Sequence, residues 1–145
     1  MSPTQLKSTI DAKQDAIIEE FSRLDDDWME KYQYLINLGQ ELPELDSRYI
    51  NDNTQLQGCQ AQVWLHSYMS DGNLHFEAKV DAHIVRGIAA LLIRVLSGNH
   101  PEDIKNADLY FIDEIGLEKH LSPVRSNGLN AMVEEMRRRA RDCCQ

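Results

Sequence analysis

Cys59 is the residue whose type and surroundings most suggest chemistry. It follows Gly58 in the stretch QGCQAQVW, residues 57–64, where most neighbours are polar. Buried cysteines behave as small apolar residues, so polar flanks argue against a packing role. The other two cysteines, Cys143 and Cys144, are adjacent near the end of the chain, and an odd total does not suit a disulfide framework. The pattern indicates a thiol that reacts, as a thiolate of lowered pKa, with something outside the chain.

Two other chemistries are open to this thiol. Cys59 paired with one of the five histidines would be a cysteine-nucleophile hydrolase, although no local signature of such an enzyme accompanies it. His66 and His75, which we expect to face each other across a hairpin, would with Cys59 make a passive metal or cluster scaffold. No CxxC or HxxxH pair supports a zinc site, which needs three or four protein ligands. We therefore expect no metal and no cofactor bound by this chain.

The part of the chain before the cysteine is predicted to be mainly helical. Apolar residues at helical spacing predict a helix over residues 4–22, but Gln14 interrupts their stripe, so we expect residues 1–24 to be loosely attached. Three aspartates at 25–27 are N-cap candidates for a second helix, which runs to about Leu38. Gly39 is placed to end that helix in a left-handed conformation.

A β-hairpin is predicted directly after the cysteine. Apolar and polar residues alternate over 62–69 and 74–80, and the turn sequence SDGN at 70–73 favours a tight connection. Asp81 is the predicted N-cap of the next helix. That helix is the most apolar in the chain, so we expect it to be the central packing element and to end at Gly98.

The last third of the chain is predicted to hold short helices and one final long helix. Pro101 suits the first turn of a short helix, and another is expected over 108–115. Residues 122–126 are predicted to be an irregular connection, with the last helix beginning near Ser126 or Asn127 and residues 142–145 frayed. Together the elements predict one α+β domain, residues 1–145, with a small antiparallel sheet and helices packed on one face.

Composition narrows the classes of function. The chain has 145 residues and a formal net charge of −9, which argues against nucleic-acid binding because such proteins usually carry a basic face. No apolar run approaches the roughly 20 residues of a membrane span. The first residues do not combine a basic region with an apolar stretch, so we expect no secretion signal. Unpaired cysteines then indicate a reducing compartment, and we expect the cytoplasm.

Four motifs, in order, resemble those of the SufE family, the sulfur acceptors of cysteine desulfurases. They are KYQYLINLGQELP at 31–43, QGCQAQVW at 57–64, DAHIVRG at 81–87 and HLSPVRSNGL at 120–129. The residues after the cysteine favour the SufE branch over the related CsdE branch. The resemblance covers roughly residues 25–140 and implies a compact fold shared with the scaffold proteins of iron–sulfur assembly.

The resemblance also implies a function and a set of site residues. Cys59 would take sulfane sulfur as a persulfide from a SufS-like, or alternatively CsdA-like, desulfurase, whose pyridoxal phosphate belongs to that partner, and pass it to iron–sulfur scaffold proteins. The chain would thus be an accessory protein rather than an enzyme. Four residues are expected to restrain the cysteine's loop or to dock the partner: Gly58, Gln60, Asp81 and Arg125. Arg125 is also the candidate positive neighbour of the thiol, and Gly58 the candidate hinge.

Overall fold

The computed structural model of the chain describes residues 9–24 and 27–143. Its elements in order are α1 (Thr9–Ser22), α2 (Trp28–Gln40), a short 3-10 turn η2 (Ser47–Tyr49), β1 (Val63–Ser70), β2 (Asn73–Val80), α3 (His83–Leu96), α4 (Pro101–Asn106), α5 (Phe111–Glu114), α6 (Leu117–His120) and α7 (Pro123–Cys143). The predicted α+β class is confirmed. Within the described residues, no helix is both long and apolar enough to cross a membrane.

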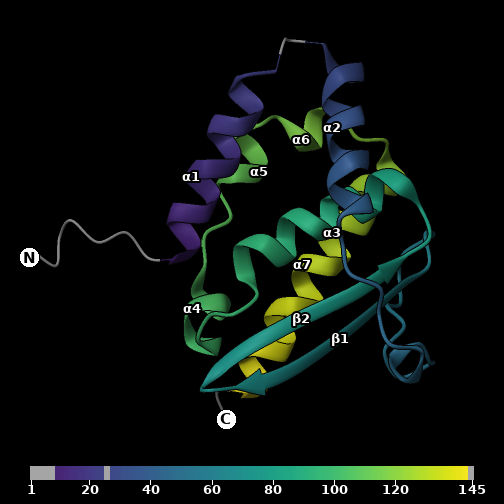
Figure 1. Ribbon diagram of the computed structural model, residues 1–145, viewed down its shortest axis with the longest axis vertical. Helices are drawn as coiled ribbons and strands as arrows, with labels where there is room; N and C mark the ends of the chain where they lie inside the picture. Colours follow the sequence, from purple (N-terminus) through teal and green to yellow (C-terminus); the bar gives the residue numbers. More distant parts are fainter. Residues whose placement is uncertain (1–8, 25–26, 144–145) are drawn as a thin grey trace, which may run out of the picture.

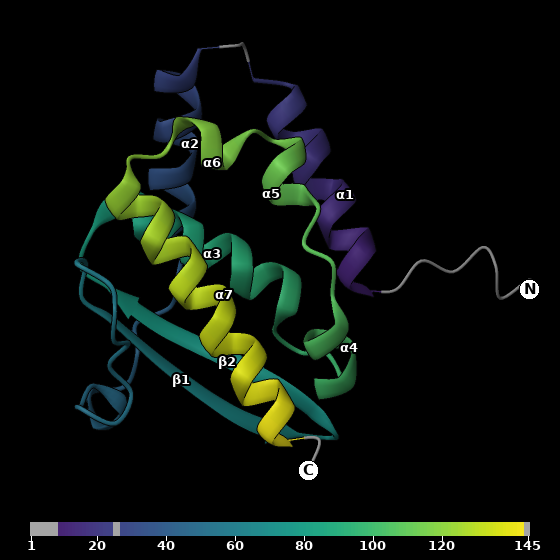
Figure 2. The ribbon, with the colours of Figure 1, turned by 180° about the vertical axis from the view of Figure 1, so that it is seen from behind.

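The hairpin forms where the alternating pattern predicts it. β1 and β2 are antiparallel, with Val63 opposite Val80 and Ser70 opposite Asn73. Asp71 and Gly72 connect them with φ angles of 52° and 80°, the left-handed pair of a type I′ turn. The alternate β2 residues Leu74, Phe76, Ala78 and Val80 are all buried. In Figures 1 and 2, α3 and α7 lie on the same side of the hairpin, so one sheet face is covered by helices as predicted.

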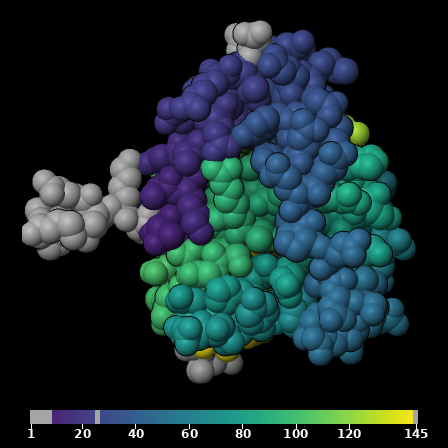
Figure 3. Space-filling view, in the orientation of Figure 1, coloured from purple at the N-terminus to yellow at the C-terminus, as the bar shows by residue number. Residues whose placement is uncertain are grey.

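α3 is the central packing element, as its composition predicts. Eight of its fourteen residues are buried, and it packs against α1, α2, β2 and α7. Gly98, with φ 83°, follows it, in agreement with the predicted end. In Figure 3 the chain around α2 and the segment after it, in blue, lie beside the teal hairpin and α3. The hairpin, α2 and the segment that follows α2 are therefore all arranged around α3.

Gly39 has a different role from the predicted one. It does not end α2, which continues to Gln40, and it is not among the glycines of positive φ. Instead, α2 and α3 touch here through glycine. A Cβ on Gly39 would lie 2.8 Å from the backbone N of Gly87, and one on Gly87 would lie 2.1 Å from the carbonyl O of Leu35. The glycine is therefore required by the contact between two backbones.

α1 is packed into the protein rather than loosely attached. Gln14, the residue that interrupts its apolar stripe, is fully buried and uses both ends of its amide. Its Nε2 donates to the carbonyl O of Asp108 at 3.0 Å, and its Oε1 accepts from the N–H of Phe111 at 3.1 Å. A buried polar side chain with its hydrogen bonds satisfied does not loosen a helix. Residues 4–8 of the predicted helix lie outside the described residues.

Two parts of the C-terminal region also differ from prediction. Residues 123–126 are not irregular, because α7 begins at Pro123, a residue that suits the first position of a helix. The N–H of Ser126 donates to the carbonyl O of Ser122 at 2.9 Å, which closes the first turn. At the other end α7 continues through Asp142 to Cys143, where we expected a frayed tail. The helix over 108–115 is shorter than predicted, and α6 was not predicted.

A partly buried ion pair joins α1 to α3. Arg94 donates from Nη1 to Glu20 Oε1 at 3.0 Å and from Nη2 to the other carboxylate oxygen, and the hydroxyl of Tyr34 on α2 also donates to Glu20. The hydrogen bond from Arg94 lowers the pKa of Glu20, an effect that burial opposes. Burial, followed by the bond to Glu20, raises the pKa of Tyr34 to about 12. Three helices are thus linked through one carboxylate.

Replacing Glu20 by Gln should lower the free energy of unfolding at pH 7 by about 1 kcal/mol, since the pair remains partly open to solvent. The pKa of folded Glu20 lies below its ordinary value of 4.5, so its contribution is complete above that pH and is lost as the pH falls through the folded pKa. Urea unfolding of both proteins between pH 3 and 7 measures this. A difference in stability that is the same at pH 3 and pH 7 would contradict the assignment.

Candidate functional site

The cysteine lies in a loop that is held at its base. We call residues 57–62 the cysteine loop. Before it, the chain runs antiparallel to the start of β1, where Leu56 N–H donates to Val63 O at 2.7 Å and Leu65 N–H donates to Thr54 O at 2.9 Å. These bonds bring the two ends of the loop together. The loop itself is irregular, and its backbone makes no hydrogen bond within the described chain until Gln62 is reached.

Cys59 is half-buried against the core of the protein. Its Sγ lies 3.9 Å from the carbonyl O of Gly128 on α7, a weak contact for a thiol donor. Burial raises the pKa of the Cys59 thiol above its ordinary value of 9.0, and no cationic residue in the described chain offsets this. The resting thiol is therefore protonated at neutral pH and is a poor nucleophile, contrary to the expectation of a lowered pKa.

Asp81 anchors the far end of the cysteine loop. Its Oδ1 accepts from the N–H of Gln62 at 2.8 Å, and its own N–H donates to Gln62 O at 3.1 Å. The predicted role as N-cap is wrong, because the cap of α3 is Ala82, which makes no side-chain cap hydrogen bond. The carboxylate instead binds Gln62, the last residue of the cysteine loop, three positions after Cys59. A helix cap and a loop anchor look alike in sequence, since both are an aspartate before a helix.

Replacing Asp81 by Ala should loosen the loop without unfolding the hairpin. The exposed hydrogen bond from Gln62 contributes about 1 kcal/mol, so exchange of the Gln62 amide hydrogen should accelerate about fivefold. Asp81→Asn retains an acceptor oxygen and should restore most of the protection. Hydrogen exchange followed by NMR resolves both effects. Equal exchange at Gln62 in the wild type and in Asp81→Ala would show that the side chain does not restrain the loop.

Gly58 and Gln60, on either side of Cys59, are both exposed. Gly58 has φ 85°, a conformation that strains other residues, and a Cβ there would meet nothing within 4 Å. The backbone, not a lack of space, therefore requires the glycine. Gln60 makes no hydrogen bond to any residue in the described ranges, so it does not restrain the loop in this state. A role in docking a partner remains a proposal for Gln60.

Arg125 does not act on the thiol. It lies in the first turn of α7, where its N–H donates to Ser122 Oγ at 3.4 Å, and its half-buried side chain makes no ion pair within the described residues. It has no influence on the pKa of Cys59, which burial alone raises. The same helix contributes Gly128, whose carbonyl group lies beside the sulfur. The motif at 120–129 thus supplies a backbone contact to the cysteine, which residue types alone did not reveal.

Three of the five histidines stack on aromatic rings. His66 stacks on Tyr49 with ring centroids 3.6 Å apart, His75 stacks on Tyr68 at 5.0 Å and His120 stacks on Trp28 at 4.0 Å. His66 lies opposite Glu77 in the hairpin, so it does not face His75 directly. Across residues 9–24 and 27–143, no three His, Cys, Asp or Glu side chains are grouped to hold a metal ion. Within the same residues, no histidine is hydrogen-bonded to Cys59, whose sulfur contacts the Gly128 carbonyl instead.

Comparison with known proteins assigns the family. The sequence matches SufE, described as an Fe-S metabolism associated domain, over residues 15–140. The chain belongs to the SufE family. The match extends from α1 almost to the end of α7 and includes the cysteine loop, Asp81 and the start of α7.

Individual relatives agree with this membership in the SufE family. An uncharacterized SufE-like protein of Rhizobium meliloti is 39% identical over 131 residues, which cover 87% of this chain and 93% of that protein. Another, from Rhizobium etli, is 40% identical over 135 residues and 90% of each chain. A solution structure of a hypothetical protein from Thermus thermophilus has a TM-score of 0.73 over 90% of this chain and 94% of its own, at 23% identity, which supports the fold alone.

Proposed function

We propose that this SufE-family protein is an accessory sulfur carrier that also activates its donor. It accepts sulfane sulfur on Cys59 from a pyridoxal-phosphate-dependent cysteine desulfurase and relays it to iron–sulfur cluster assembly in the cytoplasm. The observation that carries the proposal is the position of Cys59 within a loop whose backbone, among the described residues, is hydrogen-bonded only at its ends, and which lies in the family's matched region. A small-molecule pocket is not needed for this chemistry, because the substrate sulfur arrives on another protein.

The proposed reaction is an exchange between two sulfur atoms. Cys59 loses its proton to water and, as the thiolate, attacks the outer sulfur of the donor's cysteine persulfide. A new S–S bond forms at Cys59 while the donor's S–S bond breaks, and the donor cysteine leaves as a thiolate that takes up a proton. The Cys59 persulfide then holds the sulfur at the sulfane level, so no external oxidant or reductant is required.

The raised pKa of the resting thiol indicates when this reaction occurs. Burial is its only cause, so moving Cys59 away from Gly128 toward a polar partner surface removes the effect. Gly58, which already has a positive φ, lies next to the cysteine and supplies backbone freedom for that movement. In this proposal the loop shields an unreactive thiol until a donor binds, and the anchors at Leu56 and Gln62 keep its ends in place.

Mass spectrometry tests the proposal directly. The protein is incubated with a purified cysteine desulfurase and free cysteine, and the peptide containing residue 59 is examined for an added sulfur atom. We expect that atom on Cys59, removable by a thiol reductant, together with faster cysteine turnover by the desulfurase. Sulfur found only on Cys143 or Cys144, or none on any cysteine beside an active donor, would refute the proposal. The protein alone should not hydrolyse chromogenic esters or amides, since no histidine is hydrogen-bonded to Cys59 in the described residues.

A further inference from the structure

The edge of β2 that faces away from β1 has backbone groups at Ala78 that are unpaired within the described chain, and we call this stretch, between Phe76 and Val80, the window. Alternate β2 residues point their backbone groups away from β1, as the N–H of Leu74 shows by donating to Asn99 O at 2.9 Å. Two residues on, Phe76 N–H donates to Ser97 Oγ at 2.9 Å. At the far end Val80 O accepts from Arg86 Nε at 3.0 Å. Between them, the N–H and C=O of Ala78 have the same outward direction but no hydrogen-bond partner in residues 9–24 and 27–143.

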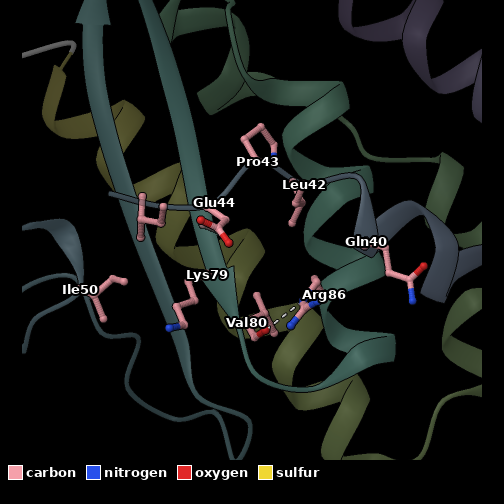
Figure 4. Close-up of a pocket in the computed structure, with 11 residues that line it drawn as sticks. Gln40, Leu42, Pro43, Glu44, Ile50, Lys79, Val80 and Arg86 are labelled. Carbon is pink, nitrogen blue, oxygen red and sulfur yellow. Dashed lines mark hydrogen bonds between the residues drawn. The ribbon is translucent and has the colours of Figure 1, made fainter. Parts of the chain in front are cut away.

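This window opens into a pocket of about 410 Å³. Its wall opposite the strand is the segment that follows α2, and Figure 4 shows Leu42, Pro43 and Glu44 on that side with Lys79, Val80 and Arg86 on the other. Ala78 is only 5% exposed, so its unpaired backbone groups are sheltered. Sheltered backbone groups are normally paired, since leaving them without a partner costs free energy.

The outer edge of β1 differs, because its backbone groups are either paired or exposed to water. Where β1 is buried, Thr54 and Leu56 pair with it, and Arg139 Nη1 donates to Leu65 O at 2.7 Å. Toward the turn, Met69 also points its backbone outward, but this residue is 48% exposed, so water reaches the strand. The edge of β2 at Ala78 is thus both unpaired and enclosed within the described residues, the condition under which an added strand gains most.

The window lies at the end of the hairpin that carries the cysteine loop. Val80 is opposite Val63, and the next residue, Asp81, is bonded to Gln62. We propose that an extended segment of the sulfur donor adds to β2 at Phe76–Val80 as a third strand, which holds the donor beside Cys59. The inference depends on the proposed function. The state described here has an unmodified Cys59 thiol packed against Gly128. This is the state that the sulfur donor meets, whereas the scaffold protein that later receives the sulfur meets the Cys59 persulfide.

The charged residues around the window indicate which side chains the donor segment carries. Lys79 and Arg86 border the window with one carboxylate, Glu44, and none of the three is in an ion pair with another described residue. Leu42, Leu45 and Ile50 make the wall apolar. The segment that fits has apolar side chains at alternate positions and an acidic residue near Lys79. Three residues of the donor segment fill the window. Ser97 already binds the N–H of Phe76 at one end of the window, and Arg86 binds the C=O of Val80 at the other.

Hydrogen exchange of the unmutated protein is the first test, with a desulfurase already shown by mass spectrometry to load Cys59. Saturating donor should slow exchange of the Ala78 and Val80 amide hydrogens at least tenfold and leave Met69 unchanged. The Cys59→Ser variant should show the same protection, because binding at the edge does not require the thiol. Unchanged exchange at Ala78 and Val80 in a complex that still loads Cys59 overturns this inference and leaves the proposed function intact.

Substitutions give the second test. Ala78→Pro removes the outward N–H without breaking a bond to β1, so the KM for this protein as acceptor should rise about tenfold with little change in kcat. Met69→Pro is the matched control on the open edge of β1 and should leave KM unchanged. Lys79→Glu changes only the rim and should raise KM in a salt-dependent way. Equal KM values for wild type, Ala78→Pro and Lys79→Glu would contradict strand addition, and loss of loading by small persulfides in Ala78→Pro would show misfolding instead.

Discussion

Cys59→Ser is expected to abolish sulfur acceptance completely. The substitution replaces one sulfur by oxygen, and a serine hydroxyl is not ionised at neutral pH and forms no persulfide. Mass spectrometry after incubation with an active desulfurase and free cysteine should find no added sulfur at residue 59, and stimulation of cysteine turnover should fall to the rate of the desulfurase alone. Because Cys59 is only half-buried and makes one weak hydrogen bond, the free energy of unfolding should change by less than about 1 kcal/mol.

The matched control is Cys143→Ser. Cys143 is exposed at the end of α7, whereas Cys59 packs against the core, so the two thiols differ in position but not in kind. We expect wild-type acceptance from Cys143→Ser, and likewise from a chain shortened to remove Cys143 and Cys144, the second of which lies outside the described residues. Stimulation of the desulfurase by Cys59→Ser, or a substantial loss in Cys143→Ser, would contradict the proposed relay.

Gly87→Ala is expected to cause the largest loss of stability. The new Cβ would lie 2.1 Å from Leu35 O and 2.6 Å from Leu35 C, which are backbone atoms of α2 and cannot rotate away. The two helices must separate, and overpacking of this kind costs about 3 kcal/mol. Alanine gains roughly 0.5–1 kcal/mol over glycine within a helix, which is too little to compensate. Urea unfolding should therefore show a net loss of at least about 2 kcal/mol.

Gly128→Ala provides the control for this argument. Gly128 is also a buried helical glycine, but a Cβ there would meet Val85 Cγ1 at 3.7 Å, an ordinary contact. The helix preference of alanine is then unopposed, and stability should rise by roughly 0.5–1 kcal/mol. If Gly87→Ala and Gly128→Ala change stability equally, the close approach of α2 and α3 does not explain why residue 87 is glycine.

Local patterns in the sequence were sufficient to predict most helices and strands and to identify Cys59 as the central residue of the site. Alternation of apolar and polar residues located both strands, and the Asp71-Gly72 turn set their register because few other residues adopt positive φ. The apolar composition of α3 identified the helix that others pack against. Cys59 was recognisable from its polar neighbours and from four family motifs, since these depend on residues close in sequence.

Tertiary structure decided what each of several ambiguous residues contacts. Gly39 permits a backbone contact with Gly87 instead of ending a helix, and Asp81 binds Gln62 instead of capping one, because in each case a segment far away in sequence occupies the adjacent space. The pKa of Cys59 likewise depends on burial beside Gly128, 69 residues away, and not on Arg125. Residue type limits what a side chain can do, whereas packing between distant segments determines which of those possibilities is realised.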